Sequence, residues 1–512
     1  AAPRTAARLF AAETRVRGAA LARLHPADAL RLSTQAQTRW GALVLPLLLH
    51  VLLCLGLYQY GLSDAEMYRL RIDGPSRLID PYLKALKVYG PVGLLRTYLR
   101  GEQDEKLYLE YSRLLLTGKV DLAYVAERQN DASVALQELP ARAWPYRDVR
   151  VEYPPLAFVA TVPPALFTLD YRPYRYLFSA YMLGLHLLNL FLCVRLLRPP
   201  PSAAASTVSA QRVSYSSLAF LFALGSVVMT RMDHLVLTST LLTLLAFARA
   251  QQSSGSTRLR WAAACGALAA LGVLVKLVPG LAAAAAAVLW WRSGAPDRVR
   301  CIAAAACAGV CVLVLTNVVL YALAGERYLE TFRYHGLRGV QLESVYAGLI
   351  MLLRPFGVSM RVEESFGSTN LASSATGLVK QLSPVLFVLA CGGMAFLRRF
   401  SADGRGALAL SLLFMLAFML TNRVFSPQYL IWIGAPLCVL AAEAPRPAWG
   451  FWLFLGAVFL SQLIFPRGYP ILKALHPLGI LLLNLRNFSL IAFGLWFAGR
   501  TSTGPDSRSV GA

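Results

Sequence analysis

The sequence predicts an all-α polytopic membrane protein with about twelve transmembrane helices. Hydrophobic residues make up 57% of the 512 residues and charged residues only 15%, with a mean hydropathy of +0.52, which is typical of polytopic membrane proteins. Apolar runs long enough to cross a hydrocarbon core of roughly 30 Å recur from Trp40 almost to the C-terminus. The net charge of +23 would suggest nucleic acid as the partner of a soluble protein. Arg-rich cytoplasmic loops explain it here, so we expect membrane lipids and no nucleic acid as partners.

Basic residues at every alternate short loop define the predicted topology. They cluster in 195–212, 249–260, 292–300 and 398–405, which the positive-inside rule places in the cytoplasm. Both ends are then cytoplasmic: a basic amphipathic stretch over 1–40, with no cleavable signal peptide, and a tail over 499–512. The transmembrane domain, 41–498, is predicted to span the membrane at 41–60, 176–196, 213–230, 234–249, 261–277, 278–291, 301–323, 376–397, 406–421, 427–443, 448–465 and 475–498.

The opposite face carries most of the unusual polar residues. The first extracytoplasmic loop, 61–175, the turn 231–234, the second large loop, 324–375, and the segment 421–429 all fall there. Because charge near a bilayer is costly, its concentration on one face indicates a functional site. We expect a bacterial cytoplasmic (inner) membrane protein whose site faces the periplasm or the outside.

The first loop is predicted to hold juxtamembrane helices. Residues 80–99 alternate apolar and basic side chains at helical spacing, as in a helix that lies in the membrane interface. Residues 104–118 predict a second helix that ends at Gly118. Residues 154–167, with prolines at both ends, predict a short helix that does not cross the membrane.

The cysteines and acidic residues give no sign of a metal or cofactor site. All eight cysteines fall within apolar runs, where we expect small buried hydrophobic side chains. Neither an Asp-x-Asp pair nor a His-rich cluster is present, so we expect metal-independent chemistry without a cofactor. The lack of a Gly-rich phosphate loop argues against a nucleotide-sugar or ATP substrate.

Several short motifs follow one another in a characteristic order. Asp104-x-x-x-Tyr108 precedes "PYRD" at 145–148 and "EYPP" at 152–155. Then come Arg231-x-Asp233, "KLVP" at 276–279, "YHGLRGVQLES" at 334–344 and "SPQYLIW" at 426–432. The ordered set resembles the GT-C superfamily of membrane glycosyltransferases, specifically glycosyltransferase family 87, the polyprenol-phosphate-mannose-dependent mannosyltransferases.

The resemblance implies a GT-C fold and a glycosyltransferase activity. Such an enzyme moves a sugar from a polyprenyl-phosphate carrier to an acceptor hydroxyl of a glycolipid or glycan at the extracytoplasmic face. Mannose is the expected sugar, although related members use others, which leaves arabinose and glucose open. A polytopic transporter or lipid flippase is the alternative, but it predicts an internal repeat and charge near the bilayer midplane, neither of which is evident.

Inverting transfer requires one carboxylate to take the proton from the attacking hydroxyl. Asp104 is the candidate general base, and it is also well placed to cap the helix that follows. Asp64 is the rival, because it forms the same Asp-x-x-x-Tyr spacing with Tyr68.

The departing phosphate requires positive charge where negative charge develops. The candidates are Lys276, Arg338, Arg423 and His335. Lys276 could instead extend to lipid headgroups, and His335 could be structural.

The remaining candidates are expected to bind the sugar or the acceptor: Glu152, Asp148, Tyr108, Tyr153, Arg231, Asp233, Glu343 and Gln428. We expect Glu152 and Asp148 to lie at the pocket rim. Alternatives exist for some of these residues: Glu152 could pair with Arg147 or Arg150, Arg231 could pair with Asp233, and Gln428 could serve packing.

Overall fold

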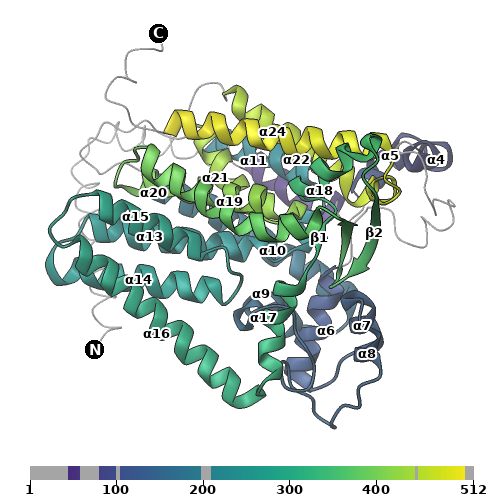
Figure 1. Cartoon of the computed structure of the whole chain (residues 1–512), viewed down its shortest axis with the longest axis horizontal. Helices are drawn as coiled ribbons and strands as arrows, with labels where there is room; N and C mark the ends of the chain where they lie inside the picture. The colour runs from purple at the N-terminus through teal and green to yellow at the C-terminus, as the bar shows by residue number, and fades with distance from the viewer. Residues whose placement is uncertain (1–43, 58–79, 100–103, 198–208, 444–447, 502–512) are drawn as a thin grey trace, which may run out of the picture.

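The computed structural model describes residues 44–57, 80–99, 104–197, 209–443 and 448–501. The rival base Asp64 and the basic stretch 1–40 lie outside these ranges, as does most of the tail 499–512. The described chain is mostly helical (Figure 1).

Among the residues that the structure describes, six helices are long and apolar enough to cross a membrane. They are α10 (Tyr171–Leu197), α16 (Arg298–Ala324), α19 (Thr376–Leu397), α20 (Gly404–Thr421), α22 (Trp449–Gln462) continued by η6 (Leu463–Arg467), and α24 (Pro477–Thr501). The other predicted spans coincide with a helix that covers Val44–Gly56 and with α11 (Ala210–Leu224), α12 (Val227–Thr230), α13 (Asp233–Gln251), α14 (Gly255–Val273), α15 (Gly280–Arg292), η5 (Pro427–Leu430) and α21 (Ile431–Ala441). The helices therefore support a membrane protein, while the count of twelve spans and their orientation stay predictions.

Small residues bring neighbouring helices of this bundle close together. A Cβ on Gly266 of α14 would lie 1.8 Å from the Ala305 carbonyl oxygen of α16, and one on Gly272 would lie 2.9 Å from the Ser239 side chain of α13. Without a hydrophobic force between helices in lipid, such close backbone contact supplies much of their attraction. The remainder of α16 slopes away from the bundle (Figure 1).

The outward position of α16 corrects one expectation. Cys307 and Cys311 of this helix are exposed, whereas Cys54, Cys193 and Cys301 are buried as expected. None of the most apolar window of α16 is buried inside the protein, so these two thiols face the surroundings of the bundle.

The first loop folds into the predicted helices with one difference. The single helix expected over 80–99 is two, α4 (Asp80–Tyr89) and α5 (Pro91–Leu99), because Gly90 adopts φ +66° between them. Helix α6 (Asp104–Thr117) ends before Gly118, whose φ is +74°, as predicted. Helices α7 (Leu122–Gln129) and α8 (Ala132–Ala135) follow, and η3 (Pro155–Ala157) with α9 (Phe158–Ala165) form the short proline-flanked helix.

The second large loop contradicts the all-α prediction. After α17 (Arg327–Leu337) it forms a three-stranded antiparallel sheet in the order β1-β3-β2, from β1 (Val340–Gln341), β2 (Met360–Ser365) and β3 (Ser368–Ser373). Phe366 and Gly367 make the β2–β3 turn with φ +52° and +59°, which suits the twist of a tight hairpin. Helix α18 (Val345–Leu352) interrupts the strands.

One face of the sheet packs against the end of the bundle. Val340 and Leu371 form a buried cluster with residues of α18, α24 and the short helix α23 (Tyr469–Lys473). Helices α6, α7 and α8 and the strands lie in the right half of Figure 1, with α17 beside them, and the turn between α14 and α15 contacts the same region, because the Leu156 amide donates to the Leu274 carbonyl oxygen at 2.8 Å. The loops predicted for the extracytoplasmic face therefore share one end of the molecule.

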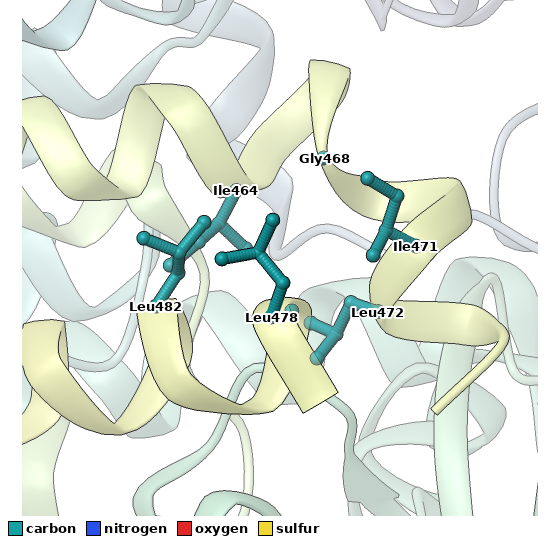
Figure 2. Close-up of a pocket in the computed structure, with 7 residues that line it drawn as sticks. Ile464, Gly468, Ile471, Leu472, Leu478 and Leu482 are labelled. Atoms are coloured by element: carbon teal, nitrogen blue, oxygen red, sulfur yellow. The ribbon is translucent and has the colours of Figure 1, made fainter. Parts of the chain in front are cut away.

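A small apolar pocket lies beside this cluster, between η6, α23 and α24 (Figure 2). Its lining is Ile464, Gly468, Ile471, Leu472, Leu478, Gly479 and Leu482. Because these residues offer no polar side chain, the pocket carries no chemistry.

Candidate active site

A cavity of about 1160 Å³ lies where the two large loops meet the helix bundle. Its walls come from the first loop, residues 273–278, α16, α17, the sheet, α19, α20 and residues 421–432 and 465–473. Most of the site residues predicted from the sequence line it: Asp104, Glu152, Tyr153, Arg231, Lys276, His335, Arg338, Glu343, Arg423 and Gln428. Residues more than 300 positions apart in the chain are thereby brought to one chamber.

Asp104 is the first residue of α6 and is only 3% exposed. Its Oδ1 is paired with Arg128 and its Oδ2 with Arg231. Two guanidinium groups and the N-terminal end of the α6 dipole compensate for the burial of this carboxylate, and the guanidinium groups hold it in one orientation. To accept a proton, one oxygen must exchange a guanidinium contact for the substrate hydroxyl.

Arg128 is a site residue that the sequence reasoning missed. It lies near the end of α7, outside every motif, and no periodicity of the chain marks it. Only the turn of the chain between α6 and α7 brings its guanidinium onto Asp104.

The structure rules out the suggested Arg231–Asp233 ion pair. Arg231 ends α12 in an extended conformation (φ −121°, ψ 142°) and reaches Asp104, whereas Asp233 starts α13 and points into the bundle. Asp233 is fully buried and does not line the cavity. Its Oδ1 lies 2.7 Å from Lys276 Nζ and accepts a 2.6 Å hydrogen bond from Trp432 Nε1.

Lys276 points into the protein, not toward lipid headgroups. Its ammonium lies 5.2 Å from the Tyr429 ring centroid and 5.3 Å from that of Trp432, and these two rings are stacked 4.2 Å apart. The salt bridge to Asp233 and the two aromatic faces together compensate for the loss of water around the ammonium.

Arg338 and Arg423 form a different part of the cavity wall. Arg423 Nη2 donates to the carbonyl oxygens of Gly336, at 2.6 Å, and of His335, at 3.1 Å. Within the described ranges, neither Arg338 nor Arg423 is paired with a carboxylate, and the buried Nε of Arg338 has no hydrogen-bond partner. Both cations are therefore free to meet an anion in the cavity.

His335 links the two large loops. Its Nε2 donates to the backbone oxygen of Glu152 at 3.0 Å. The ring surface is open to the cavity, but the surrounding protein removes much of the water around it. This desolvation, and after it the positive charge of Arg338, lowers the pKa of His335 to about 4. The imidazole is then neutral at pH 7 and contributes a hydrogen bond without a charge.

Glu152 faces the cavity beside the sheet. Its Oε2 lies near the Gly367 turn, and its backbone oxygen accepts the hydrogen bond from His335. The suggested salt bridges are not formed, because Arg147 pairs with Asp148 at 2.9 Å and Arg150 with Asp131 at 3.1 Å.

Besides Asp233, two more of the expected binding residues do not line the cavity. Tyr108 is buried behind Tyr153, and its ring packs against the Tyr153 ring with the centroids 5.7 Å apart. Asp148 was expected at the pocket rim, and that expectation is wrong. Its carboxylate turns back to accept a 2.8 Å hydrogen bond from the Trp144 amide and to pair with Arg147.

Glu343 and Gln428 line the cavity as expected. Behind Glu343, Arg486 of α24 is fully buried, lies 4.1 Å from the Phe425 ring centroid and donates to the Glu343 carbonyl oxygen at 2.6 Å. Sequence reasoning missed Arg486, although a charged residue within an apolar span is a usable signal.

The cavity also has an extended apolar side. It is formed by α16, α17, α19 and α20 together with the loop before α15, and its apolar lining includes Leu277, Leu313, Phe332, Pro384, Phe387 and Phe418. Lys380 of α19 lines the same side and is exposed. A long apolar group could therefore lie along this wall while its polar end meets Arg338 and Arg423.

The described residues contain no group of three or more His, Cys, Asp or Glu side chains arranged to hold a metal ion. The metal independence expected from the sequence stays a prediction.

Comparison with known protein families gives a match. The family model described as Glycosyltransferase family 87 matches residues 152–427, more than half of the chain. Asp104 and Arg128 precede the matched segment, and Tyr469, Lys473 and Arg486 follow it. The chain matches no curated protein and no solved structure.

Proposed function

The chain belongs to glycosyltransferase family 87, and on this premise we propose that it moves a sugar from a polyprenyl-phosphate carrier to an acceptor hydroxyl. Mannose is the proposed sugar, and a glycolipid or glycan the proposed acceptor. The observation that carries the proposal is one cavity that holds an oriented carboxylate, Asp104, together with two cations that lack a carboxylate partner within the described ranges, Arg338 and Arg423.

Asp104 is proposed as the general base of an inverting transfer. The acceptor oxygen attacks C1 of the sugar, the bond from C1 to the phosphate oxygen breaks, and the phosphate leaves with the electron pair. Asp104 takes the hydroxyl proton, a step that contributes roughly 10²–10⁴-fold to the rate in enzymes of this kind. Arg231 and Arg128 hold the carboxylate in place before the acceptor arrives.

Arg338 and Arg423 are proposed to bind the donor phosphate. A guanidinium offers a planar pair of N–H donors that matches two phosphate oxygens. Lys276 forms a salt bridge with Asp233, so we expect it to contribute less to phosphate binding than Arg338 and Arg423 do. Negative charge grows on the phosphate as the sugar leaves, and cations fixed at that point stabilise the transition state.

The apolar side of the cavity supports a donor with a lipid carrier. Leu313 of α16 and Phe387 of α19 line it, and both helices are apolar enough to cross a membrane. A polyprenyl chain could enter from the bilayer along these helices and leave its phosphate beside Arg338. The polar residues lie at one end of the bundle, so we propose that the site faces the periplasm or the outside of a bacterial cytoplasmic membrane.

The proposal is tested with purified protein and a polyprenyl-phosphate mannose labelled in the sugar. We expect Asp104→Asn to abolish transfer to acceptor and to retain donor binding, because the amide cannot take a proton. Near-normal transfer by Asp104→Asn together with an inactive Asp64→Asn would move the base to Asp64. Directional movement of the donor across vesicles without sugar release would instead favour the transporter or flippase.

A further inference from the structure

The wall of the cavity beside α23 holds a second cluster of polar and aromatic side chains. Glu364 and Thr369 come from the paired strands β2 and β3, while Phe465 belongs to η6 and Tyr469 and Lys473 to α23. All five line the cavity that contains Asp104. None of them belongs to a motif recognised in the sequence, and the last three lie beyond the segment that matches the family.

The cluster is organised around the Glu364 carboxylate. Lys473 Nζ lies 2.5 Å from Glu364 Oε1, and the Thr369 hydroxyl donates to the same carboxylate at 2.9 and 3.0 Å. Register places Glu364 directly opposite Thr369, so both side chains lie on the same face of the hairpin.

An aromatic surface adjoins this polar group. The Tyr469 ring meets Phe465 edge-on, with centroids 5.2 Å apart, and Lys473 Nζ lies 5.6 Å from the Tyr469 centroid. The Glu364 and Lys473 side chains are 47% and 42% exposed, so a ligand can reach both charged groups without opening the protein.

We propose that Glu364, Tyr469 and Lys473 form a carbohydrate subsite, which binds a sugar of the acceptor other than the one that is glycosylated. This inference rests on the proposed glycosyltransferase function. A pyranose presents an apolar face to an aromatic ring and hydroxyl groups at its edge. Here the carboxylate accepts from those hydroxyls and the ammonium donates to them.

The charge balance distinguishes a sugar from a second anion. Lys473 is matched by Glu364, so the local net charge is zero, whereas Arg338 and Arg423 have no carboxylate partner among the described residues. A phosphate or a carboxylate would be repelled by Glu364. A neutral polyol can use both charges, and the aromatic ring adds the apolar contact that specific sugar binding requires.

The subsite also separates acceptor choice from the chemistry. Tyr469 and Lys473 of α23 lie outside the matched family segment, whereas Arg338 and Arg423 lie within it, so the proposal assigns acceptor selectivity in part to a segment other than the one that holds the phosphate cations. An acceptor that carries at least two sugars then gains affinity from the second one.

The experiment measures binding of methyl α-mannobioside to the purified full-length protein by saturation-transfer NMR, with methyl α-mannoside and inorganic phosphate as comparison probes. We expect the disaccharide to bind more tightly than the monosaccharide. Tyr469→Ala should weaken disaccharide binding roughly tenfold, and Tyr469→Phe should retain most of it. Lys473→Met should weaken it less, because one hydrogen-bond donor is lost and the ring is kept.

Tyr215→Ala is the matched control, because Tyr215 is an exposed tyrosine of α11 that does not line the cavity. Equal binding of the disaccharide by wild type, Tyr469→Ala and the control would overturn the subsite, as would no binding to the wild type or phosphate binding lost in Lys473→Met. Release of mannose from the labelled donor is followed in parallel. If the wild type never cleaves the donor, the proposed function fails; if it does cleave it but Tyr469→Ala binds the disaccharide normally, only the subsite fails.

Discussion

The two charged walls of the cavity differ in how their cations are balanced. On one wall, Lys276 is paired with Asp233, and Arg231 is paired with Asp104. On the other, Arg338 and Arg423 meet no carboxylate within the described ranges. In the sequence, the cations of both walls have the same signal, a basic residue at the end of an apolar run or in a loop of the same face.

The difference separates charges that hold the protein together from charges that await a ligand. A paired buried cation cannot be removed without stranding its partner, so its loss is felt first in stability. A cation without a carboxylate partner is repelled by the cations near it and adds little to the stability of the folded protein. Its removal should therefore weaken the binding of an anion before it lowers the stability. The following predictions test this distinction.

The largest effect is expected at the paired wall. Lys276→Met leaves the fully buried Asp233 without its ammonium, and breaking a buried pair from one side costs about 3–5 kcal/mol of stability. The double variant Lys276→Met/Asp233→Asn should recover part of that loss, because the stranded charge is removed. Thermal unfolding in detergent measures both. If Lys276→Met alone unfolds at the wild-type temperature, the pair does not hold the bundle.

At the wall of Arg338 and Arg423 we expect a smaller effect, and we expect it in donor binding or turnover, not in stability. Arg338→Ala should lower donor affinity or turnover roughly tenfold to a hundredfold, since a hydrogen bond to a charged group contributes about 1.5–3 kcal/mol. Arg423→Ala should behave alike. Arg338→Lys should also lose activity, because an ammonium cannot reproduce the paired donors of a guanidinium.

Unfolding of the Arg338 variants provides the control for this prediction. Their unfolding temperatures should stay close to that of the wild type. Wild-type donor binding and turnover in Arg338→Ala and Arg423→Ala alike would show that the phosphate lies elsewhere.

Glu105, the residue after Asp104, gives a pH-dependent test of how a buried charge affects stability. Glu105 is fully buried in the first turn of α6, 3.0 Å from Arg175 Nε, and accepts a hydrogen bond from the Tyr171 hydroxyl at 3.1 Å. Burial, opposed in part by the Arg175 charge, raises the pKa of Glu105 from 4.5 to about 7. The folded protein therefore holds this proton more tightly than the unfolded chain, and stability falls as the pH rises from the unfolded pKa to the folded one.

Removal of that ionisation should stabilise the protein only at higher pH. We expect Glu105→Gln to gain about 2 kcal/mol over the wild type between pH 5 and pH 8. Thermal unfolding at several pH values measures the difference, and Glu127→Gln, another acid of the first loop, serves as control. A difference that does not change with pH would mean that Glu105 stays ionised through its pairing with Arg175.

The last experiment, for which we expect the smallest change in the protein itself, tests on which side of the membrane the two walls lie. Single cysteines near Thr257 and Ser401 should react with an impermeant reagent only from the cytoplasm, and those near Ser368 and Tyr469 only from the outside. Labelling of Ser401 and Ser368 positions from the same side would overturn the twelve-span topology and place the cavity on another face.

Much of the site could be predicted from the chain itself, because its signals are local. Asp104 precedes an amphipathic helix that ends at Gly118, and Lys276 follows an apolar run. Each of the predicted spans of which the structure describes residues coincides with a helix, since apolar length and helical periodicity are properties of a single segment. The order of the motifs also predicts that Glu152, Arg338 and Arg423 share one site, and all three line the same cavity.

The sequence by itself determined where the long apolar helices lie, that they suit a membrane, and which loops between them carry the unusual polar residues. The tertiary structure alone decided which charge meets which. Arg231 reaches Asp104 and leaves Asp233 to Lys276 and Trp432, because α13 begins between the two motif residues and turns them apart. The sheet of the second loop and the cluster of Glu364 with Lys473 depend on contacts between segments far apart in the chain. Such contacts depend on the packing of distant segments, and no local pattern encodes them.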